Sequence, residues 1–284
     1  MRYIELPGRG RCRVRQVIGP EGAPTVLLLH GWTATADLNW GRCYAGLSEH
    51  VNVVALDQRG HGGGVRGPFS LEACADDAAA LIEALGTGPV IAVGYSMGGP
   101  VATLLWRRHP ELVVGMVLCA TAAQFAVTSI EQLALSALAA CARPARGVPL
   151  SALRTVRVLA GGARRWTGPG WRRAALDVIG RHDPAAMLQA ARALIGYRAD
   201  SWLGAIQAPA AVVMTTADHL VPPGRQLRLA RSIPGCSLFA VDGDHGVCSV
   251  RPERFLPPLV AALADVGARA QSRPGPAVPP TVAA

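Results

Sequence analysis

The sequence contains no lysine, so all 28 of its basic residues are arginine. Against 19 acidic residues they give a net charge of +9, a sign that favours nucleic acid or anionic lipid as a partner. Aromatic residues, however, make up only 5% of the chain, and they are not interleaved with the arginines. We therefore expect most of the excess charge to be solvated surface, and we expect no nucleic-acid partner.

Long apolar segments are also missing. No run reaches the roughly 18 residues that span a bilayer, and the nearest candidate, residues 125–142, carries Glu131 and Gln132 in its middle. The first residues, Met-Arg-Tyr-Ile-Glu-Leu-Pro-Gly, lack the apolar core of a secretory signal. Together these features predict a cytoplasmic location.

Paired or clustered cysteines are absent as well. The seven cysteines stand singly, without a Cys-x-x-Cys pair or a Cys/His cluster at the spacing of a zinc site. An odd number of thiols fits reduced cysteines in a cytosol, where most would act as small core hydrophobes. The sequence also lacks a phosphate-binding Gly-Lys-Ser loop. We expect neither a metal nor an organic cofactor.

Half of the residues are hydrophobic and only 17% are charged, which is enough apolar material for one large core. Hydrophobic periodicity predicts strands at 11–18, 25–30, 51–57, 89–95, 112–120, 210–216 and 237–241. It predicts helices at 70–85, 97–109, 225–231 and 252–266. The central strands are nearly continuous apolar runs, which is typical of strands covered on both faces. The sequence thus predicts an α/β fold with a mostly parallel central sheet and helices on both faces.

The regular alternation stops between residues 124 and 203. Prolines and glycine pairs divide this stretch into several helical pieces, and it holds eleven arginines against four acidic residues. We interpret 124–203 as a helical cap inserted into an α/β core formed by 1–123 and 204–267. The last residues, 268–284, consist largely of Ala, Pro, Gly, Ser and Arg and are predicted to form a disordered tail.

A Gly-x-Ser-x-Gly pattern, Gly94-Tyr95-Ser96-Met97-Gly98, lies between a predicted strand and a predicted helix. A tight strand-to-helix turn needs small residues on both sides, and it exposes the serine hydroxyl at the edge of the sheet. The start of the helix adds free backbone N–H groups and a positive dipole near the reacting atom. Ser96 is therefore the candidate nucleophile. The alternative is a plain glycine turn with an exposed serine.

Serine is a weak nucleophile and needs a base that is itself held by an acid. Asp218 follows the predicted strand at 210–216, and His245 follows the predicted strand at 237–241. The carboxyl ends of parallel strands meet at one edge, so both loops should reach Ser96. We predict that Asp218 is the acid and His245 the base.

Other residues compete for these roles. Asp242 remains a second candidate for the acid, whereas Asp244 adjoins His245 and could scarcely reach its Nδ1 atom. His219 follows the predicted acid directly, so its side chain should diverge from it. Cys248 lies near the predicted base, but it lacks a strand-to-helix turn and is expected in the core.

The chain resembles the alpha/beta hydrolase superfamily over nearly everything outside the insertion and the tail. The resemblance implies a nucleophile elbow at Gly94–Gly98 and a catalytic triad of Ser96, Asp218 and His245. The family's Asp-x-Arg-Gly-x-Gly turn matches Asp57-Gln58-Arg59-Gly60-His61-Gly62, and we expect it to have a structural role.

The same resemblance implies an oxyanion hole. The family's His-Gly dipeptide falls on His30-Gly31, which would make the backbone N–H of Trp32 one oxyanion donor. Met97, directly after the nucleophile, would supply the other donor. His30 and Gly31 are expected to support this loop, with His30 bracing it rather than taking a proton.

Some residues depart from particular branches of the superfamily. Ser96 stands where epoxide hydrolases and haloalkane dehalogenases place an aspartate, and Trp32 replaces the proline that epoxide hydrolases place after His-Gly. Carbon–carbon bond hydrolases commonly have asparagine before the serine, where this chain has Tyr95. These departures disfavour all three chemistries.

The resemblance implies a cofactor-independent serine hydrolase that cleaves a carboxylic ester of a small-molecule acyl substrate. A thioesterase, lactonase, perhydrolase or acyltransferase would use the same triad. A catalytically silent protein that binds a small ligand is the alternative from another class. We expect the insertion to roof the active site, and its arginines to allow at most weak contact with an anionic membrane surface.

Overall fold

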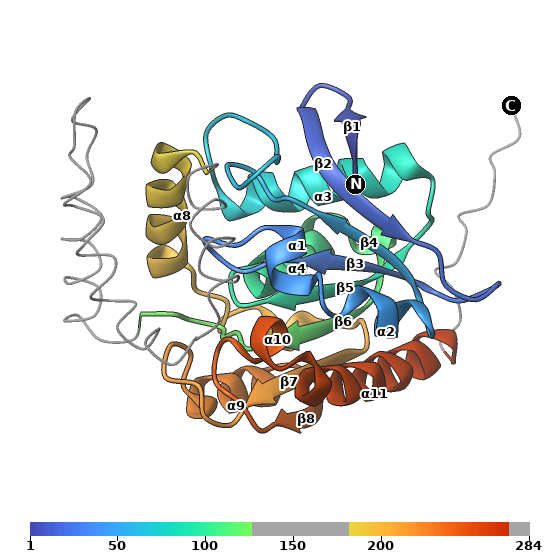
Figure 1. Cartoon of the computed structure of the whole chain (residues 1–284). Helices are drawn as coiled ribbons and strands as arrows, with labels where there is room; N and C mark the ends of the chain where they lie inside the picture. Colours follow the sequence, from blue (N-terminus) through green and yellow to red (C-terminus); the bar gives the residue numbers. More distant parts are fainter. Residues whose placement is uncertain (127–181, 273–284) are drawn as a thin grey trace, which may run out of the picture.

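The computed structural model describes residues 1–126 and 182–272. Its centre is an eight-stranded sheet in the order β1-β2-β4-β3-β5-β6-β7-β8 (Figure 1). Strand β2 runs antiparallel to both of its neighbours, β1 and β4. From β4 to β8 in this order, every pair of adjacent strands is parallel. The mostly parallel α/β sheet predicted from the sequence is therefore confirmed. The strands are β1 (Arg2–Leu6), β2 (Gly10–Val17), β3 (Thr25–Leu29), β4 (Asn52–Leu56), β5 (Val90–Tyr95), β6 (Val113–Cys119), β7 (Ala210–Thr215) and β8 (Ser237–Val241).

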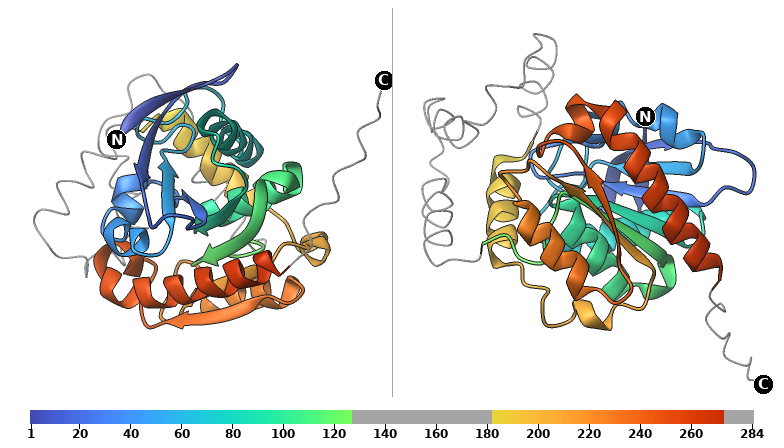
Figure 2. Two further views of the ribbon diagram at one scale, coloured as in Figure 1. Left: turned by 90° about the vertical axis from the view of Figure 1, so that its right-hand side faces the viewer. Right: turned by 90° about the horizontal axis from the view of Figure 1, so that it is seen from below.

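Helices cover both faces of this sheet, as the views in Figure 2 show. One apolar core lies beneath α3 (Leu71–Leu85), α4 (Gly98–Arg108) and α9 (Pro223–Ser232). The second core lies beneath α1 (Ala36–Trp40), α2 (Tyr44–Ser48), α10 (Val247–Val250) and α11 (Pro252–Gln271). Short 3₁₀ turns, η1 (Pro110–Leu112) and η3 (Leu203–Ala205), precede β6 and β7. The central strands are buried between these layers, which explains their continuous apolar runs.

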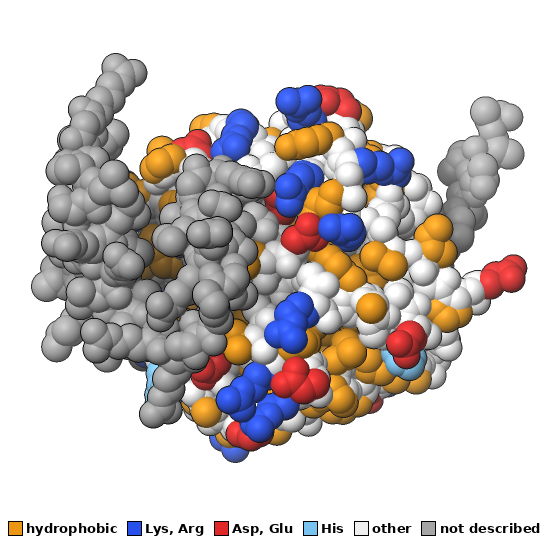
Figure 3. Space-filling view, viewed as in Figure 1, with side chains coloured by type: hydrophobic (Ala, Val, Ile, Leu, Met, Phe, Trp, Pro, Cys, Tyr) orange, Lys and Arg blue, Asp and Glu red, His pale blue; other side chains and the backbone are white. Residues whose placement is uncertain are grey.

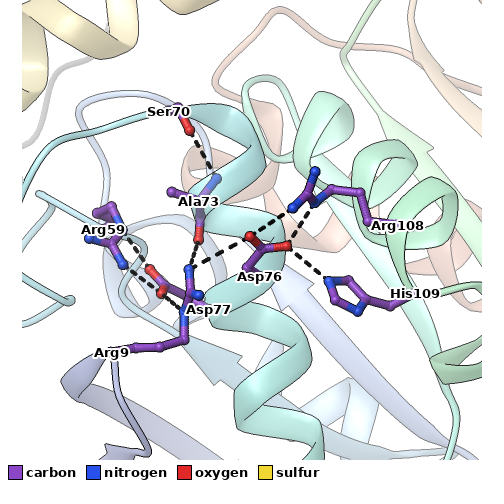
Figure 4. Close-up of polar contacts among 8 residues, drawn as sticks. All are labelled: Arg9, Arg59, Ser70, Ala73, Asp76, Asp77, Arg108 and His109. Carbon is purple, nitrogen blue, oxygen red and sulfur yellow. Dashed lines mark hydrogen bonds and ion pairs between the residues drawn. The ribbon is translucent and has the colours of Figure 1, made fainter.

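Two adjacent carboxylates on α3 bind this helix to the turn after β4 and to α4 (Figure 4). Asp77 is buried and accepts hydrogen bonds from Arg9 Nε at 2.6 Å and from Arg59 Nε and a terminal Arg59 nitrogen at 2.9 and 2.7 Å. Asp76, one residue earlier, accepts a bidentate pair from Arg108 at 2.7 and 3.0 Å and contacts His109 Nε2 at 2.9 Å. Asp77 thus ties α3 to the turn after β4, and Asp76 ties it to α4.

We expect Asp77→Asn to lower the free energy of unfolding by about 3 kcal/mol, because it removes the carboxylate that Arg59 pairs with and leaves Arg9 only the 4.0 Å pair with Asp76. Asp76→Asn is the matched control on the same helix, and its more exposed pairs should lose less than about 1 kcal/mol. Urea unfolding of both variants measures the difference. Equal losses would contradict a special role for the buried Asp77.

The turn after β4 is held by its first residue. Asp57 is fully buried, and its carboxylate accepts the backbone N–H groups of Ala36 and Gly63, both at 2.9 Å. The Arg13 guanidinium lies 3.2 Å from the same carboxylate. Together with the contact from Arg59 to α3, these bonds fix the turn beside the loop that follows β3.

The predicted insertion, 124–203, is described at its two ends only; residues 127–181, which hold nine of its eleven arginines, lie outside the described residues. The chain leaves after β6 and returns beside itself, because Gln124 and Arg198 form an antiparallel bridge and the Ala199 N–H donates to the Ala123 carbonyl at 3.1 Å. Helix α8 (Pro184–Gly196) belongs to the returning end.

The predicted start of the tail at residue 268 is wrong. Helix α11 continues to Gln271, because its last turn is alanine-rich and Arg269 pairs with Asp265 one turn earlier at 2.6 Å. Arg269 also donates to the carbonyls of Gly235 and Ala210, both at 2.7 Å, which fastens this turn to the sheet. Residues 273–284 lie outside the described residues.

On the face seen in Figure 3, arginine side chains stand among acidic and apolar ones and do not gather in a patch of one sign.

Among the helices of residues 1–126 and 182–272, none is both long and apolar enough to cross a membrane.

Candidate active site

Ser96 lies in a sharp turn between β5 and α4. Its φ angle of +52° is in the left-handed region, which a residue with a side chain adopts only when its surroundings enforce it. Glycines make this turn possible, because a Cβ atom on Gly94 would overlap the Gly98 carbonyl and one on Gly98 would overlap that of Leu29. The Thr121 hydroxyl donates to the Ser96 carbonyl at 2.7 Å. This strained turn holds the serine hydroxyl at the carboxyl end of the sheet.

The structure brings the three predicted residues together. His245 Nε2 lies 3.0 Å from Ser96 Oγ, and His245 Nδ1 lies 2.7 Å from Asp218 Oδ2. Each residue occupies a loop directly after β5, β7 or β8, so parallel strands deliver all three side chains to one edge. The arrangement is a continuous hydrogen-bonded series from carboxylate to imidazole to hydroxyl, as a serine nucleophile with a base and an orienting acid requires.

Asp218 is buried, yet hydrogen-bond donors surround it. Its Oδ1 atom accepts the backbone N–H groups of Leu220 and Val221, both at 2.9 Å, and its Oδ2 atom accepts the Thr215 hydroxyl at 2.8 Å. Burial by itself raises the pKa of the Asp218 carboxyl, but the hydrogen bond and charge of His245 and these donors outweigh burial and hold that pKa below its ordinary value. Asp218 is therefore ionised and able to orient and stabilise a protonated imidazole.

A residue that sequence reasoning missed completes the set of hydrogen-bond donors around Asp218. Gln226, on α9, donates to the Thr215 hydroxyl at 2.8 Å and to the Val221 carbonyl at 2.7 Å, while its own carbonyl accepts the Thr215 N–H at 3.1 Å. Its side chain thereby fixes the loop that carries Asp218. Its Nε2 also donates to Asp218 Oδ2 at 3.4 Å. No motif marks this glutamine, because the backbone groups, the hydroxyl and the carboxylate that it contacts are brought together by the fold.

The competing acids are engaged elsewhere. Asp242 is exposed and pairs with Arg254 at 2.8 Å. Asp244 Oδ1 accepts the backbone N–H of Gly246 at 2.9 Å, which shapes the turn containing His245. His219 is exposed, directly after the acid. Within the described residues, Asp218 is the carboxylate that contacts the imidazole.

The loop after β3 is held by His30. Its Nε2 atom must accept, because its partner at 2.8 Å is the backbone N–H of Gln58. Nδ1 therefore carries the proton and donates to the Gly31 carbonyl at 2.8 Å. In a trans peptide the N–H points opposite to the C=O. Since the Gly31 carbonyl points at His30, the N–H of Trp32 points away from it.

The two N–H groups expected to form an oxyanion hole flank the nucleophile. Met97 directly follows Ser96 and is the N-cap of α4, and a Cβ atom on Gly31, the residue before Trp32, would lie 3.4 Å from that of Ser96. Neither the Trp32 N–H nor the Met97 N–H donates a hydrogen bond within the described part of the chain. Asn39 accepts the Gly31 N–H at 2.9 Å, which steadies the loop from its other side. Both N–H groups are therefore available to a ligand oxygen.

Two further histidines continue from His30. The His61 ring packs edge to face against His30, and the His182 ring packs edge to face against His61, with centroids 5.2 Å apart in each pair. His182, at the returning end of the insertion, accepts the Gly62 N–H through Nδ1 at 3.0 Å, and its Nε2 lies 3.2 Å from the Thr33 carbonyl. The returning end of the insertion is thus hydrogen-bonded to the loop after β3 that carries Trp32, which we call the oxyanion loop. No motif in the sequence marks this histidine.

The histidine cluster predicts acid lability. Burial lowers the pKa of His30 to about 3, and burial also lowers the pKa values of His61 and His182 from 6.5. Below pH 6.5 the unfolded chain binds protons that the folded protein excludes, so stability is lost as the pH falls. Each such histidine contributes up to about 1.4 kcal/mol per pH unit. Urea unfolding at several pH values between 7 and 5 measures how steeply the free energy of unfolding falls with pH. This fall should be shallower in His61→Gln than in the exposed-site control His219→Gln, and equal slopes would contradict the prediction.

In the described part of the chain, no three His, Cys, Asp or Glu side chains are grouped as metal ligands. The polar groups around Ser96 are instead a base, an acid and backbone donors. This set can abstract the serine proton and receive negative charge on a substrate oxygen.

The chain is similar to known proteins over most of its length. A poly(3-hydroxyalkanoate) depolymerase from Ectopseudomonas oleovorans is 27% identical over 297 residues, covering 97% of this chain and 96% of that protein. A pimeloyl-(acyl-carrier protein) methyl ester esterase from Chromobacterium violaceum is 29% identical, covering 76% of this chain and 84% of that protein. The crystal structure of the enol-lactonase from Burkholderia xenovorans LB400 aligns with a TM-score of 0.78 and 25% identity, covering 93% of this chain and 100% of that one.

The family model described as "alpha/beta hydrolase fold" matches residues 24–252, from the start of β3 to the end of the segment that contains His245. The match runs across the insertion and includes every residue of the elbow and the two loops that meet it. This chain therefore belongs to the alpha/beta hydrolase family.

Proposed function

We propose that the protein is a serine hydrolase that cleaves a carboxylic ester through an acyl-enzyme, with Ser96 as nucleophile, His245 as base and Asp218 as acid. The observation that carries the proposal is the hydrogen-bonded series of these three residues, at 3.0 and 2.7 Å, at one edge of the sheet. Such a series activates a hydroxyl that is otherwise unreactive at neutral pH.

The reaction has two halves. His245 Nε2 takes the proton from Ser96 Oγ as that oxygen attacks the ester carbonyl, and the protonated imidazole then gives this proton to the leaving alcohol. The Trp32 and Met97 N–H groups receive the oxyanion, each contributing about 2.7–4 kcal/mol at the transition state. Water, deprotonated by His245, then attacks the acyl-enzyme, and the imidazolium returns that proton to Ser96 Oγ as the acid is released. Asp218 keeps Nδ1 protonated and stabilises the imidazolium throughout.

The relatives support an ester as the bond that is cleaved. A methyl ester esterase and a lactonase, as their names state, act on acyl–oxygen bonds. A thioesterase, lactonase, perhydrolase or acyltransferase would share the triad and differ in the leaving group or in the second nucleophile. A silent binding protein would have no need for Thr215 and Gln226 to hold an ionised carboxylate against an imidazole.

We further propose that the 124–203 insertion helps to select the substrate. Its returning end contacts the oxyanion loop directly, since the Trp32 indole N–H donates to the Met187 carbonyl of α8 at 3.2 Å. The Asp183 N–H donates to the Gly60 carbonyl at 3.0 Å in the neighbouring turn. An acyl group on Ser96 would therefore lie close to residues of this segment.

A panel of p-nitrophenyl esters from acetate to palmitate, with thioester and lactone counterparts, tests the function. We expect saturable turnover of at least one ester, with kcat/KM varying with chain length and no such turnover by Ser96→Ala. If no ester, thioester or lactone were turned over above the Ser96→Ala background, the proposed function would be wrong.

A further inference from the structure

Tyr95 is the residue immediately before the nucleophile, and its side chain reaches the loop that carries the base. It lies at the end of β5 and is almost completely buried. Its hydroxyl donates to the backbone carbonyl of His245 at 2.8 Å. One side chain therefore connects the strand that positions Ser96 to the backbone of the residue that deprotonates it.

The phenol ring is fixed before it reaches that carbonyl. It meets the rings of Trp40 and Phe255 edge to face, with centroids 5.8 and 5.6 Å away. The His245 ring packs against it as well, at a centroid distance of 5.7 Å and an interplanar angle of 62°. A ring held by residues of α1 and α11 has little freedom, so its hydroxyl is a pre-placed donor.

The direction of this hydrogen bond is unambiguous, because a carbonyl can only accept. Burial raises the pKa of Tyr95 well above its ordinary value, so the hydroxyl keeps its proton. In the described residues no backbone N–H donates to the His245 carbonyl, which is left to the tyrosine.

The rest of this loop is anchored on other groups. Asp244 bonds the Gly246 N–H at 2.9 Å, and the Cys248 thiol donates to the Asn39 carbonyl at 3.2 Å. These bonds hold the residues on either side of His245. The Gly246 N–H and the His245 carbonyl belong to one peptide, so Asp244 holds its N–H end and Tyr95 holds its carbonyl end.

We infer that Tyr95 is a positioning residue for the base: its hydroxyl sets the distance between His245 Nε2 and Ser96 Oγ by holding the His245 carbonyl. This inference rests on the proposed triad. The imidazole must approach Ser96 during acylation and again face the water during deacylation. A backbone anchored to the nucleophile's own strand limits the positions from which it does so, which affects the chemical step and leaves substrate binding unchanged.

The chain offers a matched control for the deletion of this hydroxyl. Tyr197 is buried to a similar degree and its hydroxyl also makes one hydrogen bond, to Thr103 Oγ1 at 2.8 Å, in the core on the opposite face of the sheet. Tyr95→Phe and Tyr197→Phe each remove one buried, bonded hydroxyl and keep the ring. Only the first of these hydroxyls contacts the base.

We expect Tyr95→Phe to lower kcat for a turned-over p-nitrophenyl ester by about tenfold, the value of one hydrogen bond, with KM within twofold of wild type. The rate of covalent inactivation by a fluorophosphonate should fall by a similar factor. Tyr197→Phe should leave both rates within twofold of wild type, although both variants should lose similar stability in urea unfolding.

Equal kcat in Tyr95→Phe and wild type, or an equal loss in the two variants, would overturn the inference while leaving the triad in place. A rise in KM with kcat unchanged would also overturn it, because it would make Tyr95 a binding residue. Absence of ester turnover by the wild-type protein would remove the proposed function and this inference together.

Discussion

Ser96→Ala should reduce turnover of any ester substrate by about 10⁶-fold, the loss that follows removal of a triad nucleophile in serine hydrolases. The remaining oxyanion donors and binding groups would give only residual hydrolysis. Substrate binding should persist, because the change removes one oxygen atom and leaves the turn in place. Stopped assays with high protein concentration measure the residual rate.

The same variant should fold normally. Alanine retains the Cβ atom of Ser96 and so retains the backbone strain at a φ of +52°, and the bonds of the turn to Cys119 and Thr121 involve backbone atoms of residue 96. We therefore expect an unfolding midpoint close to that of the wild type. More than a tenth of wild-type activity in a folded Ser96→Ala protein would refute the mechanism.

Asp218→Asn should lower kcat by about 10⁴-fold, because it reverses the tautomer of the base. The Leu220 and Val221 N–H groups would hold the amide oxygen where Oδ1 now lies, so the amide nitrogen would face His245 Nδ1. Nδ1 would then have to accept, and the proton would sit on Nε2, facing Ser96. A base with its proton on that atom cannot deprotonate the serine.

The control for this variant is Asp242→Asn, which changes an exposed carboxylate paired with Arg254. It should leave kcat within twofold of wild type. If instead Asp242→Asn abolished activity and Asp218→Asn did not, the acid would have been assigned to the wrong loop. Thermal unfolding of both variants guards against a general loss of structure.

Much of the fold could be predicted because burial on both faces leaves a direct trace in sequence. Strands such as β4, β5 and β7 are almost unbroken apolar runs, and each predicted strand end lies within one residue of the observed one. The helix predicted at 70–85 also matches α3, where Ser70 accepts the Ala73 N–H at 3.0 Å and Gly86 ends the helix with a φ of +61°. β1, by contrast, is a largely exposed edge strand, and its four outer residues carry no such pattern.

The predicted site residues lie together because each directly follows a strand, and the carboxyl ends of parallel strands share one edge of the sheet. Ser96, Asp218 and His245 needed no long-range information beyond a parallel sheet. The residues that hold them could not be found in this way. Gln226 contacts backbone groups, a hydroxyl and the Asp218 carboxylate, and Tyr95 contacts the carbonyl of a residue 150 positions away. Such contacts exist only once the chain is folded.

Reaction of the protein with a fluorophosphonate, followed by intact mass and peptide mapping, shows directly whether Ser96 is an activated nucleophile. We expect one adduct per chain, located on Ser96, forming with saturation and absent in Ser96→Ala. The adduct should form at least about 10³-fold more slowly in His245→Ala, because the serine then lacks its base. No adduct on the folded wild-type protein, or an adduct on another residue, would contradict the claim that Ser96 is an activated nucleophile.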